Sequence, residues 1–320
     1  MRIDLYGWTR DATRGRHDDF LSLFEEADRL GFDGVWFNEF HFQDPPQPYP
    51  STLLLGAALL ARTERIRVGT SILVLPLHDP LLLAESIAQL DRQSGGRLDI
   101  GIGRGTDPQT FDILGVDRAE ARARFEAAYD AMIRVWTEPL TAIHRASAPP
   151  FQTPHPPLYV AGSTAETLGF AARRGLPVLL SLEPPELRQL AVYAEALAEA
   201  GAPGALSRSS LCRYVCIGRD MASAVEAVDD FLARRQVARD ASALSRGVQN
   251  PPLDRDRVLS EQVIWGDPEQ CVAQIAALRR TRGTGELRCV FNGNGVLTND
   301  EALAGMRLFA QTVLPAVRDV

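Results

Sequence analysis

The chain has 320 residues, of which 45% are hydrophobic and 23% charged, and its formal net charge is −7. This composition is typical of a soluble globular protein that is long enough to bury a large core. The acidic balance disfavours a nucleic-acid or membrane partner, because both attract basic surfaces. All 34 residues in the Lys+Arg count are arginine, which excludes Schiff-base lysines and a phosphate-binding lysine.

The cysteines and the first residues suggest a location. Cys212, Cys216, Cys271 and Cys289 form no C-x-x-C pair, so we expect buried, reduced thiols. The chain starts with a strand-like sequence that lacks the apolar stretch of a signal peptide. It also lacks a run of about 18 apolar residues, the length that spans a membrane. We therefore expect a cytoplasmic protein.

Eight apolar runs of strand length follow one another along the chain. Most are continuously apolar, as expected for parallel strands that are covered on both faces. The runs span residues 2–8, 33–39, 66–76, 97–103, 156–162, 176–181, 211–218 and 286–293.

Helical patterns separate these runs. Gly31 has the character of a helix C-cap, and Ser51 and Ser163 that of N-caps. The predicted helices span residues 18–31, 51–62, 79–93, 118–136, 163–174, 184–200, 220–238, 267–280 and 299–317.

Strands that alternate with helices in this way predict one (β/α)8 TIM barrel with insertions over residues 1–320. The rival fold is a doubly wound open sheet, but such a sheet normally carries its glycine-rich turn after the first strand. Here the glycine-rich stretch follows the fourth strand. Two connections, 138–156 and 239–262, are unusually long. We interpret 239–262 as a mobile lid, and the alternative is an idle surface insertion.

The glycine-rich stretch GIGRG (101–105) raises the question of a bound phosphate. In a barrel, Arg104 lies at the C-terminal end of strand four, and a guanidinium binds phosphate oxygens well. Gly162 and Ser163 end the neighbouring strand five and open a helix, whose N-terminus attracts anions. One phosphate could contact both ends. The alternative is an ordinary strand-end turn with Arg104 in solvent.

Ordered blocks over nearly the whole chain resemble the bacterial luciferase-like monooxygenase family. The longest block is RIRVGTSILVLPLHDPLLLAESIAQLDRQSGGRLDIGIGRG, and the others lie at 31–42, 112–128, 156–181, 263–270 and 306–317. The resemblance implies a TIM-barrel flavoprotein in which reduced FMN and O₂ form a C4a-peroxyflavin that oxygenates a small organic substrate. It also implies a separate flavin reductase that supplies FMNH₂, and a homodimer formed through helices 51–62 and 80–93.

The resemblance also assigns cofactor-binding residues. Under it, the flavin phosphate is bound by residues at the ends of strands four and five, namely Arg104, Gly162, Ser163 and Thr167. A non-proline cis peptide bond, Ser71–Ile72, is expected under the flavin ring.

One departure from the family concerns catalysis. Bacterial luciferases have Glu-His-His-Phe where this chain has Glu39-Phe40-His41-Phe42. Phe40 replaces a catalytically important histidine with a ring that transfers no proton. We therefore expect a substrate other than a luciferase aldehyde, with Glu39, His41 and His78 as candidate catalytic residues. His41 and His78 also have a structural alternative, in which they only stabilise their own loops.

Two other functions remain open from the sequence. The same fold could hold a deazaflavin (F420) and transfer hydride, although the longer acidic tail of F420 calls for more cations than Arg104. A flavin-binding protein without turnover is also compatible with Phe40. No paired histidine or carboxylate spacing predicts a metal site.

Overall fold

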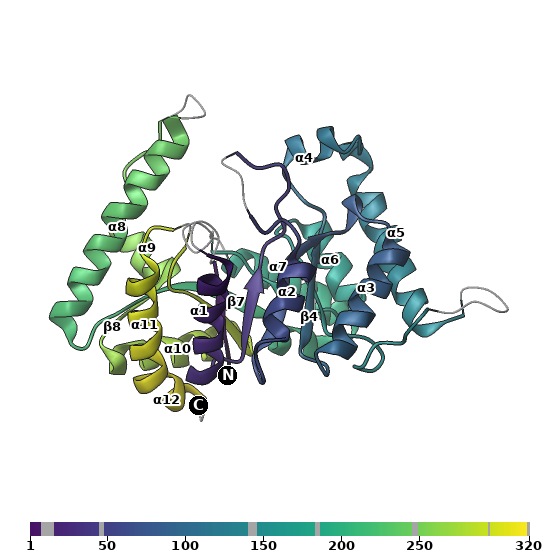
Figure 1. Cartoon of the computed structure of the whole chain (residues 1–320). Helices are drawn as coiled ribbons and strands as arrows, with labels where there is room; N and C mark the ends of the chain where they lie inside the picture. The colour runs from purple at the N-terminus through teal and green to yellow at the C-terminus, as the bar shows by residue number, and fades with distance from the viewer. Residues whose placement is uncertain are drawn as a thin grey trace.

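A closed barrel of parallel strands surrounded by helices forms this protein in the computed structural model (Figure 1). The structure describes residues 1–7, 16–44, 48–139, 146–182, 186–244, 249–293 and 295–318. The fold confirms the predicted TIM barrel. Eight strands close the barrel: β1 (Arg2–Tyr6), β2 (Gly34–Phe37), β3 (Arg67–Val74), β4 (Leu98–Gly103), β5 (Leu158–Ala161), β6 (Val178–Leu179), β7 (Ser210–Ile217) and β9 (Glu286–Val290).

The barrel closes between its first and last strands. β1 pairs with β9, so that Asp4 lies opposite Arg288. On the other side of β9, β7 pairs with it in parallel, and β7 also pairs with β6 through Ser210. Every predicted strand is present, although β6 is much shorter than the predicted 176–181.

A further strand, β8 (Val263–Gly266), was not predicted. It pairs with the second half of β7, where Tyr214 lies opposite Val263. Four residues are too few to show a strand period, and the preceding residues form a helix, so the sequence pattern did not reveal it.

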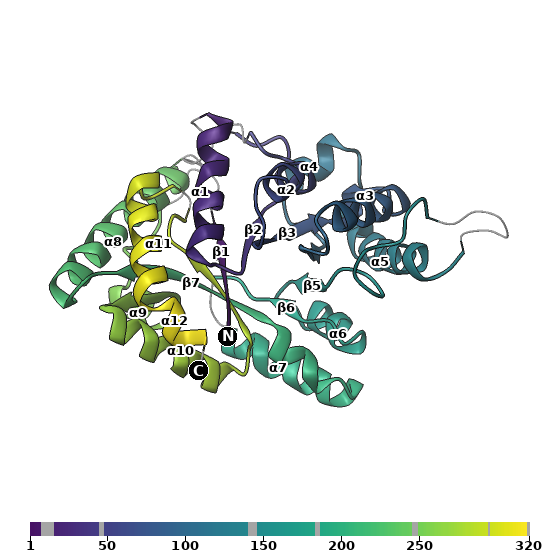
Figure 2. The same cartoon turned by 60° about the horizontal axis from the view of Figure 1, so that its bottom comes forward.

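Helices cover the barrel on all sides (Figure 2). Both chain ends lie at the same side of the molecule in the two views. The helices are α1 (His17–Leu30), α2 (Thr52–Leu60), α3 (Pro80–Gln93), α4 (Pro108–Ile113), α5 (Ala121–Thr137), α6 (Ala165–Arg173), α7 (Glu186–Ala200), α8 (Met221–Leu244), α9 (Arg255–Gln262), α10 (Pro268–Arg282), α11 (Asn299–Thr312) and α12 (Leu314–Arg318).

The helix ends explain part of this pattern. Gly31 has a left-handed φ of 89° at the end of α1, which confirms it as a C-cap. The side chain of Ser51 accepts a hydrogen bond from the Leu54 amide at 3.3 Å and so caps α2. The prediction of Ser163 as N-cap is wrong, because the Thr164 side chain accepts from the Thr167 amide and α6 begins one residue later.

The long connection 239–262 contains more regular structure than predicted. Its described part comprises the end of α8, an extended segment and α9. The Asn250 side chain donates to the Arg239 carbonyl at 2.9 Å, and the Leu253 amide donates to Gln236 at 2.8 Å. These bonds attach the segment to α8, and its role as a mobile lid stays a prediction.

The barrel interior is polar at its N-terminal end, which we call the barrel floor. The Arg2 guanidinium contacts Asp4 at 2.9 Å and Asp99 at 2.7 Å. Trp36 is 1% exposed, and its indole donates to Asp4 at 2.6 Å. A Cβ on Gly69 would lie 2.2 Å from the Trp36 ring, so glycine is required there. Ion pairs thus fill the barrel floor. The opposite, C-terminal end of the strands is called the barrel mouth below.

Candidate functional site

A cavity of about 240 Å³ opens at the barrel mouth. This is the end of a TIM barrel at which enzymes of the fold place their active sites. Residues of the four neighbouring strands β1 to β4 and of the loops that follow them form its wall. They include Tyr6, Asn38, Glu39, His41, Ser71, Ile72 and Asp107.

The three predicted catalytic residues meet at this cavity. His41 Nε2 donates to Glu39 Oε1 at 2.9 Å, and His78 Nε2 donates to the same oxygen at 2.7 Å. The second oxygen of Glu39 accepts from the Val74 amide at 2.6 Å. Glu39 and His41 line the cavity directly, whereas His78 contacts it through Glu39.

The ionisation of Glu39 decides the tautomers of both histidines. Burial raises the pKa of Glu39, but the hydrogen bond and charge of His78, the Val74 amide and His41 outweigh burial and bring the pKa below its ordinary value. An ionised carboxylate accepts only, so it fixes the proton of each imidazole on Nε2. Each Nδ1 is then the nitrogen that can accept a proton.

The floor of the cavity is built by the middle of β3. The Ser71–Ile72 peptide bond is cis, as the family resemblance predicted. The Arg288 guanidinium of β9 donates to Ser71 Oγ at 3.0 Å, and Tyr6 donates to Asn38 Oδ1 at 2.9 Å. Both Ser71 and Ile72 line the cavity, so a planar ring placed there would contact the predicted segment.

The glycines of GIGRG have a packing role. A Cβ on Gly101 would lie 2.1 Å from the Thr70 carbonyl oxygen, and one on Gly103 would lie 2.2 Å from Ile72 Cδ1. Glycine at these two positions therefore leaves room for β3, including the segment with the cis peptide bond. Gly105 has a left-handed φ of 78°, which favours glycine for its conformation. The glycines of this stretch thus allow β4 to pack closely against the segment of β3 that forms the cavity floor.

The predicted phosphate residues lie at the ends of two neighbouring strands. Ile102 of β4 lies opposite Val160 of β5, and two residues later the strands lead into Arg104 and Gly162. Arg104 is exposed and forms no hydrogen bond or ion pair within the described part of the chain. A Cβ on Gly162 would lie 2.5 Å from Thr167 Cγ2, so the bare backbone there is required.

A second arginine, which was not predicted, joins this group. Arg122 of α5 donates to Thr167 Oγ1 at 3.1 Å and reaches Glu166 at 3.3 Å. Thr167 also exchanges a hydrogen bond with Thr164 Oγ1 at 3.0 Å. Arg122 lies in an ordinary helical pattern, and no sequence signal connects it with α6.

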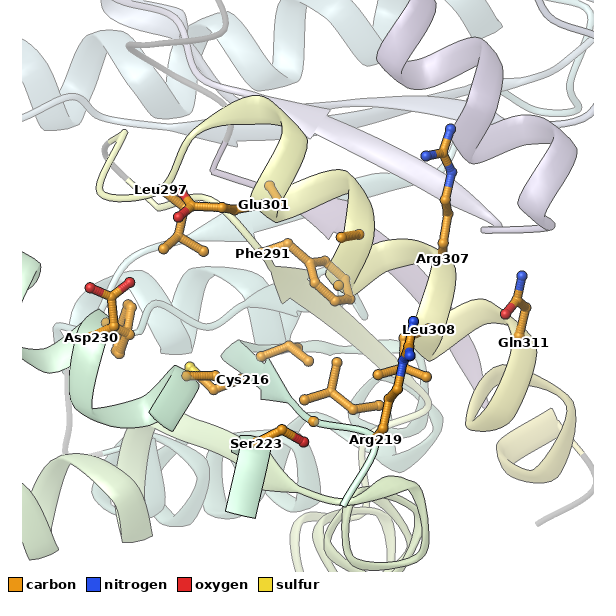
Figure 3. A pocket seen from close by; sticks show the side chains of 18 residues that line it. Cys216, Arg219, Ser223, Asp230, Phe291, Leu297, Glu301, Arg307, Leu308 and Gln311 are labelled. Carbon is orange, nitrogen blue, oxygen red and sulfur yellow. The ribbon is translucent and has the colours of Figure 1, made fainter. Parts of the chain in front are cut away.

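A larger cavity, of about 710 Å³, lies outside the barrel between α8 and α11 (Figure 3). Arg219 and Gln311 lie at one end of it, and Asp230 and Glu301 at the other. The two carboxylates are both paired with Arg234 at 2.8 Å. None of the predicted site residues lines this cavity, so its size alone does not make it the functional site.

Comparisons with known proteins identify the family of this chain. The model of the luciferase-like monooxygenase family matches residues 7–285. This chain belongs to the luciferase-like monooxygenase family. The alkanal monooxygenase alpha chain of Photorhabdus laumondii is 29% identical over 335 residues, covering 93% of this chain and 92% of that protein.

Solved structures share the whole fold. The monooxygenase RslO1 of Streptomyces bottropensis superposes with a TM-score of 0.82 at 28% identity, covering 98% of this chain and 99% of that one. The oxygenating constituent of 3,6-diketocamphane monooxygenase from Pseudomonas putida, solved with FMN, has a TM-score of 0.75 at 20% identity, covering 98% of each chain.

Family membership supports an oxidoreductase activity. The four cysteines are all buried and free, as expected. Among the described helices, none combines the length and apolar character needed to cross a lipid bilayer.

Proposed function

We propose that this protein is a monooxygenase that uses reduced FMN and O₂ to oxygenate a small organic substrate. The observation that carries the proposal is Arg104, which has no partner among the described residues and follows β4 next to the strand that leads into Gly162 and α6. A cation, bare backbone and a helix N-terminus at one place suit a phosphate monoester. The Glu39–His41–His78 group lies on the adjoining cavity.

The described residues fit both the phosphate and the ring of FMN. Arg104, Gly162, Ser163 and Thr167 would hold the phosphate, with Arg122 as a second cation that contacts Thr167. The segment Ser71–Ile72 would support the ring. The similar 3,6-diketocamphane protein was solved with FMN, which is consistent with this assignment.

Bound reduced flavin would supply the electrons that activate O₂. The chain would then contribute proton transfer and exclusion of water. With Nε2 of His41 held by Glu39, its Nδ1 is the nitrogen left for proton transfer in a residue that lines the cavity. Phe40, Val74 and Phe111 give the wall an apolar side that favours an apolar part of a substrate.

We also infer a homodimer and a separate reductase, as the family resemblance implies. On α2 and α3, three leucines point into solvent: Leu54 is 76% exposed, Leu81 45% and Leu82 66%. Exposed leucines on adjacent helices favour burial in an interface. Light scattering at micromolar concentration should give twice the chain mass, and a monomer mass would contradict the dimer.

The experiment that tests the function is anaerobic titration with reduced FMN followed by exposure to ¹⁸O₂ and candidate apolar substrates. We expect saturable binding, substrate-dependent O₂ consumption and one atom of ¹⁸O in the product. Binding of F420 with hydride transfer would replace the proposal by the deazaflavin alternative. Flavin binding without O₂ consumption by any substrate would support the non-catalytic alternative.

A further inference from the structure

A further arginine lies behind the cavity floor and, unlike the exposed Arg104, is buried. Arg288 of β9 is 2% exposed. It donates to Ser71 Oγ at 3.0 Å, to Ser210 Oγ at 3.1 Å and to the Leu180 carbonyl. Its guanidinium carbon also lies 5.0 Å from the centre of the Tyr6 ring. A guanidinium has five N–H groups, and only three acceptors are present among the described residues.

No described carboxylate forms an ion pair with Arg288. The groups that contact it are neutral: the hydroxyls of Ser71 and Ser210, a carbonyl oxygen, the Tyr6 and Trp36 rings, and the Cys212 thiol. Asp4 lies opposite Arg288 in the β1–β9 register, but its carboxyl group is bound by Arg2 and by the Trp36 indole instead. Burial raises the pKa of Cys212 to about 11 and also raises that of Tyr6, so both are uncharged at neutral pH. Burying a cation without an anion is costly, and such a charge is normally retained for a ligand or a reaction.

The position of this charge points to the ligand. Ser71 and Tyr6 both line the mouth cavity, and Arg288 contacts both. The guanidinium therefore lies one side chain behind the surface that would support the flavin ring. Arg104, by contrast, lies at the outer strand ends, where the phosphate is expected.

We propose that Arg288 is a positioning residue that stabilises the reduced isoalloxazine as its anion, deprotonated at N1. Oxidised flavin carries no ring charge, whereas two-electron reduction with uptake of one proton at N5 leaves one negative charge on the ring. A fixed cation behind the ring favours the second state, by the electrostatic tuning that proteins apply to redox cofactors. The inference rests on the proposed function, and it explains how the protein would select reduced over oxidised FMN.

Arg104 and Arg288 then have separable roles in flavin binding. The phosphate charge is the same in oxidised and reduced FMN, so Arg104 should strengthen the binding of both forms equally. Arg288 should act on the ratio of the two affinities. This ratio is linked to the reduction potential of the bound flavin, and a purely structural role of Arg288 would not change it.

The test compares dissociation constants for oxidised FMN and, anaerobically, for reduced FMN at pH 7.5. Wild type should bind the reduced form more tightly. Arg288→Gln keeps a donor for Ser71 but removes the charge, and should lower the reduced-to-oxidised preference about tenfold or more. Arg288→Lys should retain most of the preference, and Arg104→Ala should weaken both affinities with the preference unchanged. An unaltered preference in folded Arg288→Gln would overturn the inference.

A second measurement needs no variant. The absorbance spectrum of reduced FMN bound to wild type at pH 6 should be that of the anion, and the spectrum of the neutral form would overturn the inference. If wild type binds neither form of FMN, both the proposed function and this inference fail. If FMN binds and supports oxygenation but the preference does not depend on Arg288, the inference alone fails.

Discussion

The two ends of the barrel differ in how their charged side chains are paired. At the floor, Arg2 contacts Asp4 and Asp99, and Arg67 contacts Asp99 at 2.7 Å. Toward the mouth, the buried Arg288, which contacts Ser71 of the cavity, and the exposed Arg104 have no ion-pair partner within the described residues. Charges that compensate one another hold strands together and need nothing further. Charges without a partner mark the end where an anionic ligand is expected, in keeping with the division of TIM barrels into a stability face and a catalytic face.

The largest effect should come from removing a carboxylate of the barrel floor, and it should fall on stability. Asp99 is fully buried. It accepts one hydrogen bond from Arg2 and two from Arg67. Asp99→Asn removes the negative charge and leaves Arg67 without its carboxylate. We expect a loss of about 3 kcal/mol in the free energy of unfolding, measured by urea denaturation. The matched control is Glu195→Gln on the exposed face of α7, which should change stability little. Equal stability of Asp99→Asn and wild type would contradict the structural role of the floor.

At the mouth, the corresponding change should affect activity more than stability. In Glu39→Gln, the amide group of the new side chain would face N–H donors of Val74 or of the histidines. We expect the monooxygenase rate to fall by about 10²–10³-fold, because the imidazoles that we propose for proton transfer lose their orientation. FMN affinity should remain near that of wild type. A full rate in this variant would show that the Glu39–His41–His78 group is structural only.

A smaller effect on stability is expected at Glu286, the carboxyl group of the barrel floor that lies farther from Arg2 than those of Asp4 and Asp99 do. Arg2 Nη1 lies 3.8 Å from Glu286, and Glu286 Oε2 has no hydrogen-bond partner in the described part of the molecule. Burial, opposed by Arg2 and supported by Asp4, raises the pKa of Glu286 to about 7. The unfolded chain loses this proton near its ordinary value. Stability from this group is thus present at pH 4 and lost as the pH rises to 7.

Glu286→Gln tests this pH dependence. The variant keeps an oxygen for the Tyr159 hydroxyl, which donates to Glu286 Oε1 at 2.8 Å. Between pH 5 and pH 8, wild type should lose about 1–3 kcal/mol that the variant does not lose. Parallel stability curves for the two proteins, from denaturant unfolding at each pH, would show that Glu286 is ionised in the fold at pH 5.

Much of the fold could be predicted because it depends on local pattern. The alternation of apolar runs with capped helices gave eight strands in the correct order. Strand β8 and helices α4 and α9 escaped because each has only four to eight residues. The N-cap of α6 was misplaced by one residue, because Ser163 and Thr164 are adjacent and equally suited to the role.

The site could be predicted only where its residues lie at strand ends. Glu39, His41, His78 and Arg104 all follow strands whose ends the topology brings to one face. Their common contact on Glu39 Oε1 depends on loop geometry that no sequence spacing shows. Arg122 and Arg288 were not predicted, since each reaches the site from another element and its partner lies far away in the sequence, as with the 217 residues between Arg288 and Ser71.

The most direct test of the account is the affinity of Arg104→Ala for reduced FMN, compared with that of wild type and of Arg173→Ala at the other end of α6. Loss of one charge-assisted contact to the phosphate should weaken binding about 10–100-fold, while Arg173→Ala binds as wild type does. Unchanged affinity in Arg104→Ala would show that the flavin phosphate is not bound at the ends of β4 and β5.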